Sequence, residues 1–176
     1  MQCLKCNWVS YKNSQDMLLK VYIPTHIGKN VSLKDLIDYN FINAHSEPSL
    51  CGHCHANTNQ KTVWDFIPNL VCLEILRVTE RKTKSKQLRW SKNNVSISFP
   101  TSGIHLPGSS SSFRVIGTCD HRGTLYGGHW VTRMYCKSNT WYEADDLKNR
   151  VTLASTPGVK DTSVVILLLI ADTLLK

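Results

Sequence analysis

The stretch 127–146 constrains the fold of this chain more than any other. A largely aromatic and β-branched run at 130–135 is followed by a polar turn at 137–139 and by a second short run that ends in two aspartates. Two such runs joined by a turn predict a β-hairpin. A hairpin brings together residues that lie 16 positions apart, so we expect His129 and Asp145 side by side at a sheet edge.

The residue types in this hairpin suit acid–base chemistry. A carboxylate beside an imidazole fixes the tautomer of the ring and stabilises its protonated form, which is how a general base is oriented. Gly127 and Gly128 keep bulk away from His129, so that a substrate backbone has room to approach. The spacing alone fits equally well a surface histidine that lies next to an aspartate-rich turn.

The order Gly-His-aromatic followed by Trp-Tyr-x-x-Asp-Asp resembles the histidine box of the ubiquitin-specific proteases, the papain-like cysteine peptidases that remove ubiquitin. The resemblance implies that His129 is the catalytic base and that Asp145 orients it. Asp146 matches the second acidic position, which supports the site. The chain departs from the motif at Trp130, where the family has Tyr, and at Ala144, where it has Phe.

Seven cysteines without a secretory signal favour free thiols or a metal site over disulfides. Cys3-x-x-Cys6 and Cys51-x-x-Cys54 form two knuckle-like pairs, the usual source of four thiolates for a structural, tetrahedral zinc ion. The resemblance implies the same, because this family often carries a four-cysteine zinc site in its fingers subdomain. A histidine on either side of Cys54 is an alternative ligand, and two unrelated reduced pairs are the other interpretation.

The remaining patterns predict a mixed α+β fold dominated by an antiparallel sheet. A serine N-cap and apolar residues on one face predict a helix at 32–39. Alternating or continuous apolar runs predict strands at 17–24, 68–77, 94–100, 113–118 and 164–170. The resemblance divides the chain into a zinc-binding fingers-like subdomain at 1–60 and a palm with the histidine box at 61–176, without the helical thumb of the family.

The run 81–92 is dense in Lys and Arg and supplies much of the net charge of +8. Such a run is able to bind nucleic acid or another anionic surface. Only Trp90 among its residues is aromatic, so no stacking platform for bases is evident. We therefore favour a solvated hairpin tip between two strands and do not expect a nucleic-acid partner.

A papain-like hydrolase needs a cysteine nucleophile, and none is recognisable in this chain. The family's cysteine lies in a box of the form Asn-x-Gly-Asn-Thr-Cys-Tyr ahead of the fingers, and nothing like it occurs between residues 1 and 176. Four of the cysteines are assigned to metal, and the other three, Cys72, Cys119 and Cys136, fall within predicted strands. We expect these three to be buried or edge thiols.

Three functions remain open. The first is the C-terminal part of a deubiquitinase that hydrolyses the isopeptide bond at the C-terminus of ubiquitin, inactive alone because its nucleophile is missing. The second is a pseudoenzyme that binds ubiquitin without cleaving, and the third is a zinc-stabilised basic module for nucleic acid. We rank them in that order, and the expected partners are ubiquitin or ubiquitinated proteins.

The sequence also predicts the compartment. The most apolar run, 164–170, is far shorter than the roughly 20 residues that cross a bilayer, so no membrane association is expected. The cysteine chemistry and the family resemblance together place the protein in the cytoplasm or the nucleus.

Overall fold

The protein is described here by a computed structural model. The residues that it describes are 2–10, 18–24, 27–42, 49–58, 60–61, 66–82, 88–136 and 140–174. Within these ranges no helix has the length and apolar character needed to span a bilayer. The predicted turn at 137–139 lies outside the described residues.

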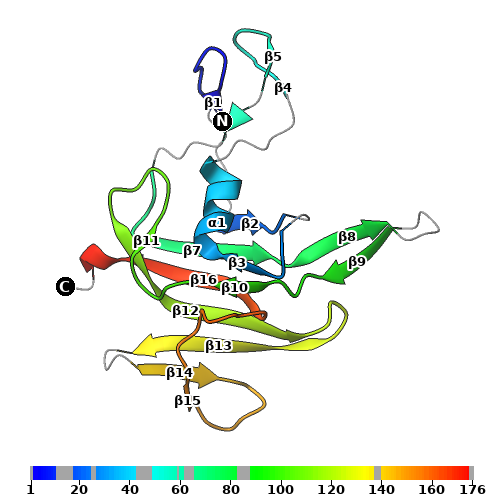
Figure 1. The fold of residues 1–176 in the computed structure, drawn as a ribbon. Coiled ribbons are helices and arrows are strands. Elements are labelled where there is room, and N and C mark those ends of the chain that lie inside the picture. The colour runs from blue at the N-terminus through cyan, green and yellow to red at the C-terminus, as the bar shows by residue number, and fades with distance from the viewer. Residues whose placement is uncertain are drawn as a thin grey trace.

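The centre of the molecule is a mixed eight-stranded sheet with the order β15-β14-β13-β12-β16-β7-β2, in which β11 also pairs with β12 (Figure 1). Every neighbouring pair is antiparallel except β2 and β7. The strands are β2 (Leu19–Tyr22), β7 (Leu70–Leu76), β11 (Ile104–His105), β12 (Ser112–Gly123), β13 (Gly128–Cys136), β14 (Thr140–Ala144), β15 (Thr152–Ala154) and β16 (Val164–Ala171). The predicted fold class, a mainly antiparallel α+β fold, is confirmed.

Four smaller strand pairs and three short helical segments complete the described structure. The pairs are β1 (Gln2–Cys3) with β6 (Gln60–Lys61), β4 (Ser49–Leu50) with β5 (Asn57–Thr58), β3 (Asn30–Ser32) with β10 (Ser96–Ser98), and β8 (Val78–Lys82) with β9 (Leu88–Lys92). The helical segments are the α-helix α1 (Leu33–Ile37), the π-helix η1 (Asp38–Ile42) and the 3-10 helix η2 (Asp172–Leu174). The two ends of the basic run pair with each other in β8 and β9, and the predicted hairpin tip at 83–87 lies outside the described residues.

The helix α1 begins where the sequence predicts. Ser32 is its N-cap and forms a capping box with Asp35, in which each side chain accepts from the other residue's backbone N–H. From Asp38 the helix widens into η1, which the apolar pattern did not predict. The wider turn places Asn40 so that its side chain bonds both the N–H and the carbonyl of Tyr22 at the sheet edge.

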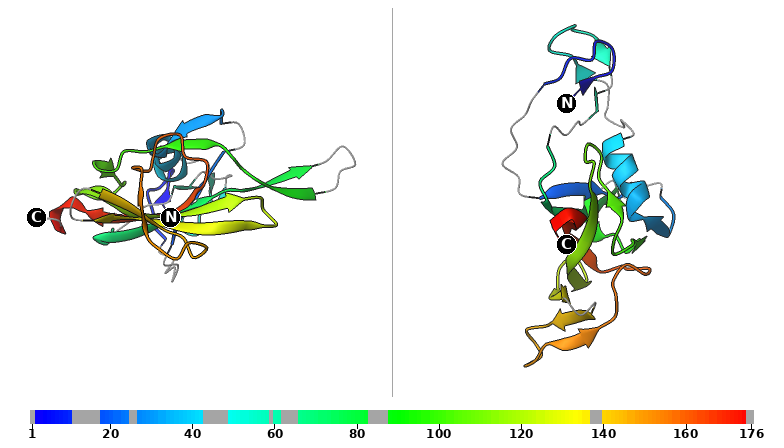
Figure 2. Two further views of the ribbon diagram at one scale, coloured as in Figure 1. Left: turned by 90° about the horizontal axis from the view of Figure 1, so that it is seen from below. Right: turned by 90° about the vertical axis from the view of Figure 1, so that its left-hand side faces the viewer.

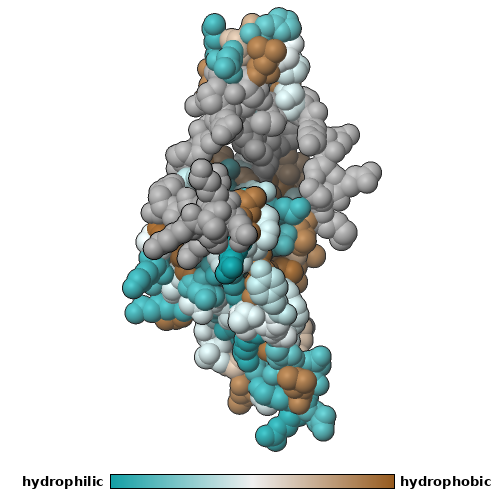
Figure 3. Space-filling view, turned by 90° about the vertical axis from the view of Figure 1, so that its right-hand side faces the viewer, coloured by the Kyte–Doolittle hydropathy of each residue, from teal (hydrophilic) through white to brown (hydrophobic). Residues whose placement is uncertain are grey.

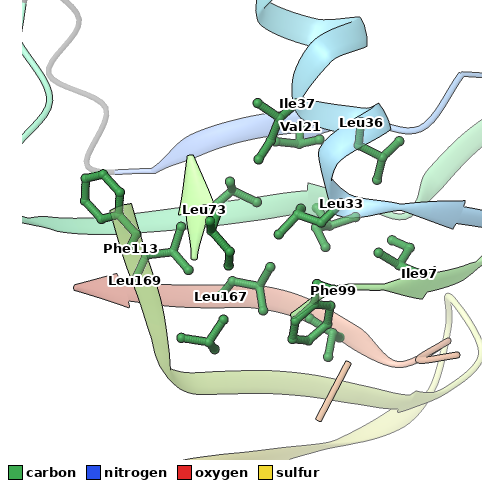
Figure 4. Packing of buried hydrophobic residues seen from close by; sticks show 14 of the residues in the cluster. Val21, Leu33, Leu36, Ile37, Leu73, Ile97, Phe99, Phe113, Leu167 and Leu169 are labelled. Atoms are coloured by element: carbon green, nitrogen blue, oxygen red, sulfur yellow. The ribbon is translucent and has the colours of Figure 1, made fainter. Parts of the chain in front are cut away.

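The hydrophobic core lies between the sheet and the layer formed by α1, β3 and β10 (Figures 2 and 4). Its largest fully buried side chains include Phe113, Leu33, Leu36, Leu73, Ile97, Leu167 and Leu169. Burying one such side chain stabilises the fold by about 1.5–3 kcal/mol. Residues that alternate with these, such as Cys72 and Leu168, are only half-buried on the opposite face of the sheet. The strand periodicity of the sequence therefore corresponds to two unequal faces.

The pairs β1–β6 and β4–β5 lie apart from this core, at the end of the molecule drawn uppermost in Figure 1. No residue of either pair belongs to the buried core cluster. Seen from the right-hand side, hydrophilic and hydrophobic residues lie next to each other at both ends of the long molecule (Figure 3). The described residues thus form a layered body, which contains the eight-stranded sheet and α1, and a small projecting unit, which contains β1, β4, β5 and β6.

Candidate active site and metal cluster

The register of β13 and β14 brings the ends of the two strands together. Thr132 lies opposite Ala144 in this antiparallel ladder. Continuing the ladder by one step puts Asp145 opposite Val131, on the same face as His129, because side chains alternate along a strand. The predicted hairpin therefore directs both side chains to one face of the sheet.

The side chains of His129 and Asp145 form a hydrogen bond. His129 Nε2 lies 2.6 Å from Asp145 Oδ1, and the same oxygen accepts the backbone N–H of Leu147 at 3.0 Å. The Asp145 side chain is only 7% exposed, whereas that of His129 is 27% exposed. The hydrogen bond from His129 is the main cause that holds the pKa of Asp145 below its ordinary value. Since Nε2 donates to the carboxylate, Nδ1 is the acceptor nitrogen of the neutral ring.

Asp146 completes the cluster from the solvent side. Its Oδ1 lies 3.4 Å from His129 Nε2, and its side chain is 85% exposed. The structure thus brings together all three residues that the hairpin motif singled out. Asp145 is the buried, hydrogen-bonded partner of the imidazole, and Asp146 adds a second negative charge beside it.

The start of β13, directly before His129, lies very close to the end of β12. A Cβ atom at Gly128 would lie 2.5 Å from Arg122 O and 2.5 Å from His121 Nε2. Gly123, directly opposite Gly128 in the ladder, has a φ of +129°. Lys92 of β9 supports this turn, since its ammonium donates to the carbonyls of His121 and Gly123. The close packing at position 128 therefore leaves room only for glycine.

A buried ion network that no sequence pattern predicts lies along the same face of the sheet. Arg133 donates to both carboxylate oxygens of Asp120, at 2.7 and 2.9 Å, and to Asp161 at 2.6 Å. Asp120 is fully buried. Arg77 donates to the carbonyl of Asp161 at 3.1 Å and so extends the network to the end of β7. Isolated charges in predicted strands are indistinguishable from surface residues when their partners are distant in sequence.

None of the three remaining thiols has the environment of an activated nucleophile. Burial raises the pKa of the Cys72 and Cys119 thiols, which disfavours the reactive thiolate. Cys119 lies opposite Thr132, three residues from His129 on β13, so its side chain is on the other face of the sheet. Cys136 ends β13, seven residues or roughly 23 Å along the strand from His129.

The other candidate residues, Cys3, Cys6, Cys51 and Cys54, converge in the projecting unit. Their four sulfur atoms lie within 4.8 Å of one another, with 4.0 Å between Cys3 and Cys54 and 3.8 Å between Cys6 and Cys51. Four thiolates at the Zn–S bond length in a tetrahedron are separated by about 3.8 Å. The donor set and its spacing therefore fit a zinc ion, as predicted.

The two pairs adopt the same local structure. The residue after each second cysteine, Asn7 and His55, has a positive φ, and its N–H donates to the carbonyl of the first cysteine. The backbone N–H groups of Cys54 and His53 lower the pKa of the Cys51 thiol to about 6. His53 stacks on Trp8, with 6.0 Å between the ring centroids, and the clustered ligands are the four cysteines. Such knuckles present thiolates to a metal through backbone geometry.

An apolar pocket of about 360 Å³ lies away from both clusters. It is bounded by α1, η1 and the segment 100–107, and its wall includes Leu33, Ile37 and Leu106. No residue of the imidazole–carboxylate cluster or of the cysteine cluster lines it.

One known family matches nearly the whole length of the chain. Residues 1–168 match the family described as ubiquitin carboxyl-terminal hydrolase, and the chain therefore belongs to that family. No curated protein matches the chain.

Solved structures that share this fold include chains of deubiquitinating (DUB) modules. The SAGA DUB module with Ubp8, Sgf11, Sus1 and Sgf73 bound to monoubiquitin matches with a TM-score of 0.64 and 17% identity, over 97% of this chain and 38% of that chain. The yeast SAGA DUB module with an Sgf73 mutant gives 0.62 and 18% identity, over 97% and 39%. At this identity the likeness shows the fold. The chain spans less than two fifths of either of these two chains.

Proposed function

We propose that this chain contributes the base and its orienting acid to a cysteine-type deubiquitinase, which hydrolyses the isopeptide bond at the C-terminus of ubiquitin. The observation that carries the proposal is the 2.6 Å hydrogen bond between His129 and Asp145 in a chain of the ubiquitin carboxyl-terminal hydrolase family. An imidazole held by a carboxylate at Nε2 offers Nδ1 to a thiol, which is the geometry that a thiol protease needs.

Each residue then has a defined role. His129 takes the proton of the cysteine thiol, and the resulting thiolate attacks the carbonyl carbon of the ubiquitin terminus. His129 next gives this proton to the leaving lysine amine, and water hydrolyses the thioester that remains. Asp145 keeps the ring oriented and stabilises its protonated form, with Asp146 as an additional charge. The zinc ion, bound by four thiolates, would be structural, because no coordination position is left for water.

The pKa of the Cys119 thiol is raised, and Cys136 lies at the far end of β13 from His129. Both observations support the proposal that the nucleophilic cysteine comes from a segment outside the described residues. Ubiquitin or a ubiquitinated protein is the proposed partner, and the cytoplasm or the nucleus is the proposed compartment. A monoubiquitin-bound DUB module shares the fold, which supports this choice of partner.

The test uses ubiquitin with a thiol-reactive electrophile at its C-terminus. We expect the purified chain to bind ubiquitin in calorimetry and to form no covalent adduct by intact mass. A polypeptide that joins a family cysteine box to this chain should form the adduct, and His129→Ala should slow that reaction by about 10²–10⁴-fold. Cys119→Ser with Cys136→Ser is the control for unspecific alkylation.

Three results would contradict the proposal. An adduct on the isolated chain that His129→Ala abolishes would mean that one of its own thiols is the nucleophile. Binding to DNA or RNA with a steep dependence on salt, and none to ubiquitin, would favour the basic nucleic-acid module instead. Ubiquitin binding without cleavage in the joined polypeptide would identify a pseudoenzyme.

A further inference from the structure

Glu143 on β14 connects two cations that flank the imidazole–carboxylate pair. Its carboxylate accepts hydrogen bonds from Arg122 Nη2 and, at 2.8 Å, from Lys148 Nζ. The Glu143 side chain is 13% exposed, whereas those of Arg122 and Lys148 are each 46% exposed. One largely buried carboxylate thus joins the end of β12, the end of β14 and the turn after β14.

Both cations are attached to the segments that carry the pair. Arg122 lies directly opposite His129 in the β12–β13 ladder. The backbone N–H of Lys148 donates to the carbonyl of Asp145 at 2.9 Å. The two ion pairs of Glu143 therefore connect the backbone on the histidine side with the backbone on the aspartate side.

Lys148 lies within reach of two carboxylates and is hydrogen-bonded to one of them. Its Nζ is 2.8 Å from Glu143 Oε1 and 3.6 Å from Asp145 Oδ2, and the longer distance exceeds that of a hydrogen bond. The hydrogen bond from Arg122 and then that from Lys148 lower the pKa of Glu143, and the bond to Glu143 raises the pKa of Lys148. Without Glu143, the nearest anion for Lys148 is the carboxylate that holds His129.

We propose that Glu143 is a positioning residue that keeps Lys148 from competing with His129 for Asp145 and that ties β12 to β14 through Arg122. This inference rests on the catalytic role proposed for His129 and Asp145. Both cations of these ion pairs are 46% exposed, and ion pairs of this kind contribute little to stability, so the effect of this arrangement lies in the placement of charge. The charged groups around the pair are Arg122 from β12, Glu143 from β14, and Asp146 and Lys148 from the turn that follows.

The test compares the zinc-loaded chain with Glu143→Gln, which keeps the shape of the side chain and removes its charge. NMR follows two signals, the ring ¹⁵N shifts of His129 and the titration of the Asp145 carboxyl ¹³C. In the unchanged chain, Nε2 should carry the proton that is donated to Asp145. In Glu143→Gln, Lys148 should move to Asp145, the ring should lose its single tautomer, and the midpoint of the Asp145 titration should fall further.

A second substitution separates competition from a general disturbance of the fold. The double variant Glu143→Gln with Lys148→Met should restore the ¹⁵N pattern of His129, because the competing cation is gone. Lys148→Met alone should raise the midpoint of Asp145, since an attractive positive charge is removed. Glu80→Gln on β8 makes the same chemical change at a carboxylate outside this ion network and should leave both signals unaltered.

The proposal is overturned if Glu143→Gln leaves the signals of His129 and Asp145 as they are. It is equally overturned if the double variant retains the altered pattern of the single variant. Amide spectra of all variants check that the sheet is intact. Neither signal involves ubiquitin or a nucleophile, so these results are independent of whether the chain serves a deubiquitinase.

Discussion

Single side chains decide how closely the ends of β12 and β13 approach each other. Gly127 and Gly128 look alike in the sequence, but only the second is packed against its neighbours. Nothing lies within 4 Å of a Cβ atom built at Gly127, whereas one built at Gly128 meets a backbone carbonyl at 2.5 Å. The requirement for glycine before His129 is therefore a requirement of position 128.

We predict that Gly128→Ala destabilises the protein by about 1–3 kcal/mol, the usual cost of overpacking. The added methyl group must displace the His121 ring or separate β12 from β13, because the carbonyl of Arg122 belongs to the ladder. Urea unfolding followed by circular dichroism measures the difference. Gly127→Ala is the matched control and should change the free energy of unfolding by less than about 0.5 kcal/mol. Equal losses in both variants would contradict the packing argument.

The carboxyl group of Asp145 makes stability depend on pH. Its pKa is lowered in the folded protein, so its contribution is fully present above the unfolded value of about 3.9 and is lost as the pH falls through the folded value. We predict that Asp145→Asn makes the free energy of unfolding less sensitive to acid than in the unchanged protein. Unfolding curves between pH 7 and pH 3 measure this slope. An unchanged slope would mean that the bond to His129 does not exist in solution.

At the level of elements, apolar periodicity predicted where strands occur but not how they pair. The strands around 68–77, 94–100 and 164–170 were predicted from their own residues, and β7, β10 and β16 lie within or around them. The parallel pairing of β2 with β7 depends on residues about 50 positions apart, which no local pattern specifies. The irregular register of β12 against β16, after Val115 and after Cys119, is likewise a product of packing.

The candidate site could be predicted because its residues belong to one hairpin. His129 and Asp145 are linked by a turn, so a local motif was sufficient to predict that they meet. Glu143 and Arg122, by contrast, occupy positions where nothing in the sequence distinguishes a functional charge from a solvated one. The role of such residues follows only from the register of three strands.

The buried ion network joins β12, β13 and the segment before β16, and it gives a prediction at this scale. Arg133→Met leaves the fully buried carboxylate of Asp120 without its bidentate partner. We expect a loss of about 3–5 kcal/mol in the free energy of unfolding, as for other buried charges that lose their partner. The double variant Arg133→Met with Asp120→Leu should recover part of this loss. If the double variant lost more unfolding free energy than the two single variants together, the pairing would be contradicted.

At the scale of the whole molecule, the layered body and the projecting unit are each stabilised by a different kind of interaction. The layered body has a continuous apolar core that runs from β2 to β14. The projecting unit contributes no residue to that core, and its buried residues include the metal-ligand candidates Cys3 and Cys51. The division of the chain near residue 60 into fingers and palm stays a prediction. It implies that metal binding stabilises the first part and that burial of apolar side chains stabilises the second.

We predict that zinc removal unfolds the projecting unit and leaves the sheet folded. Structural zinc supplies the folding free energy of units that lack a core, whereas the sheet is stabilised by burial of apolar side chains. Chelation should therefore collapse the amide signals of residues 2–10 and 49–58 while those of β12 and β16 keep their positions. Cys51→Ser should lose the metal by elemental analysis, and Cys72→Ser, which changes a thiol in the sheet, should retain it. Loss of both sets of signals together would show instead that the metal stabilises the entire chain as one cooperative unit.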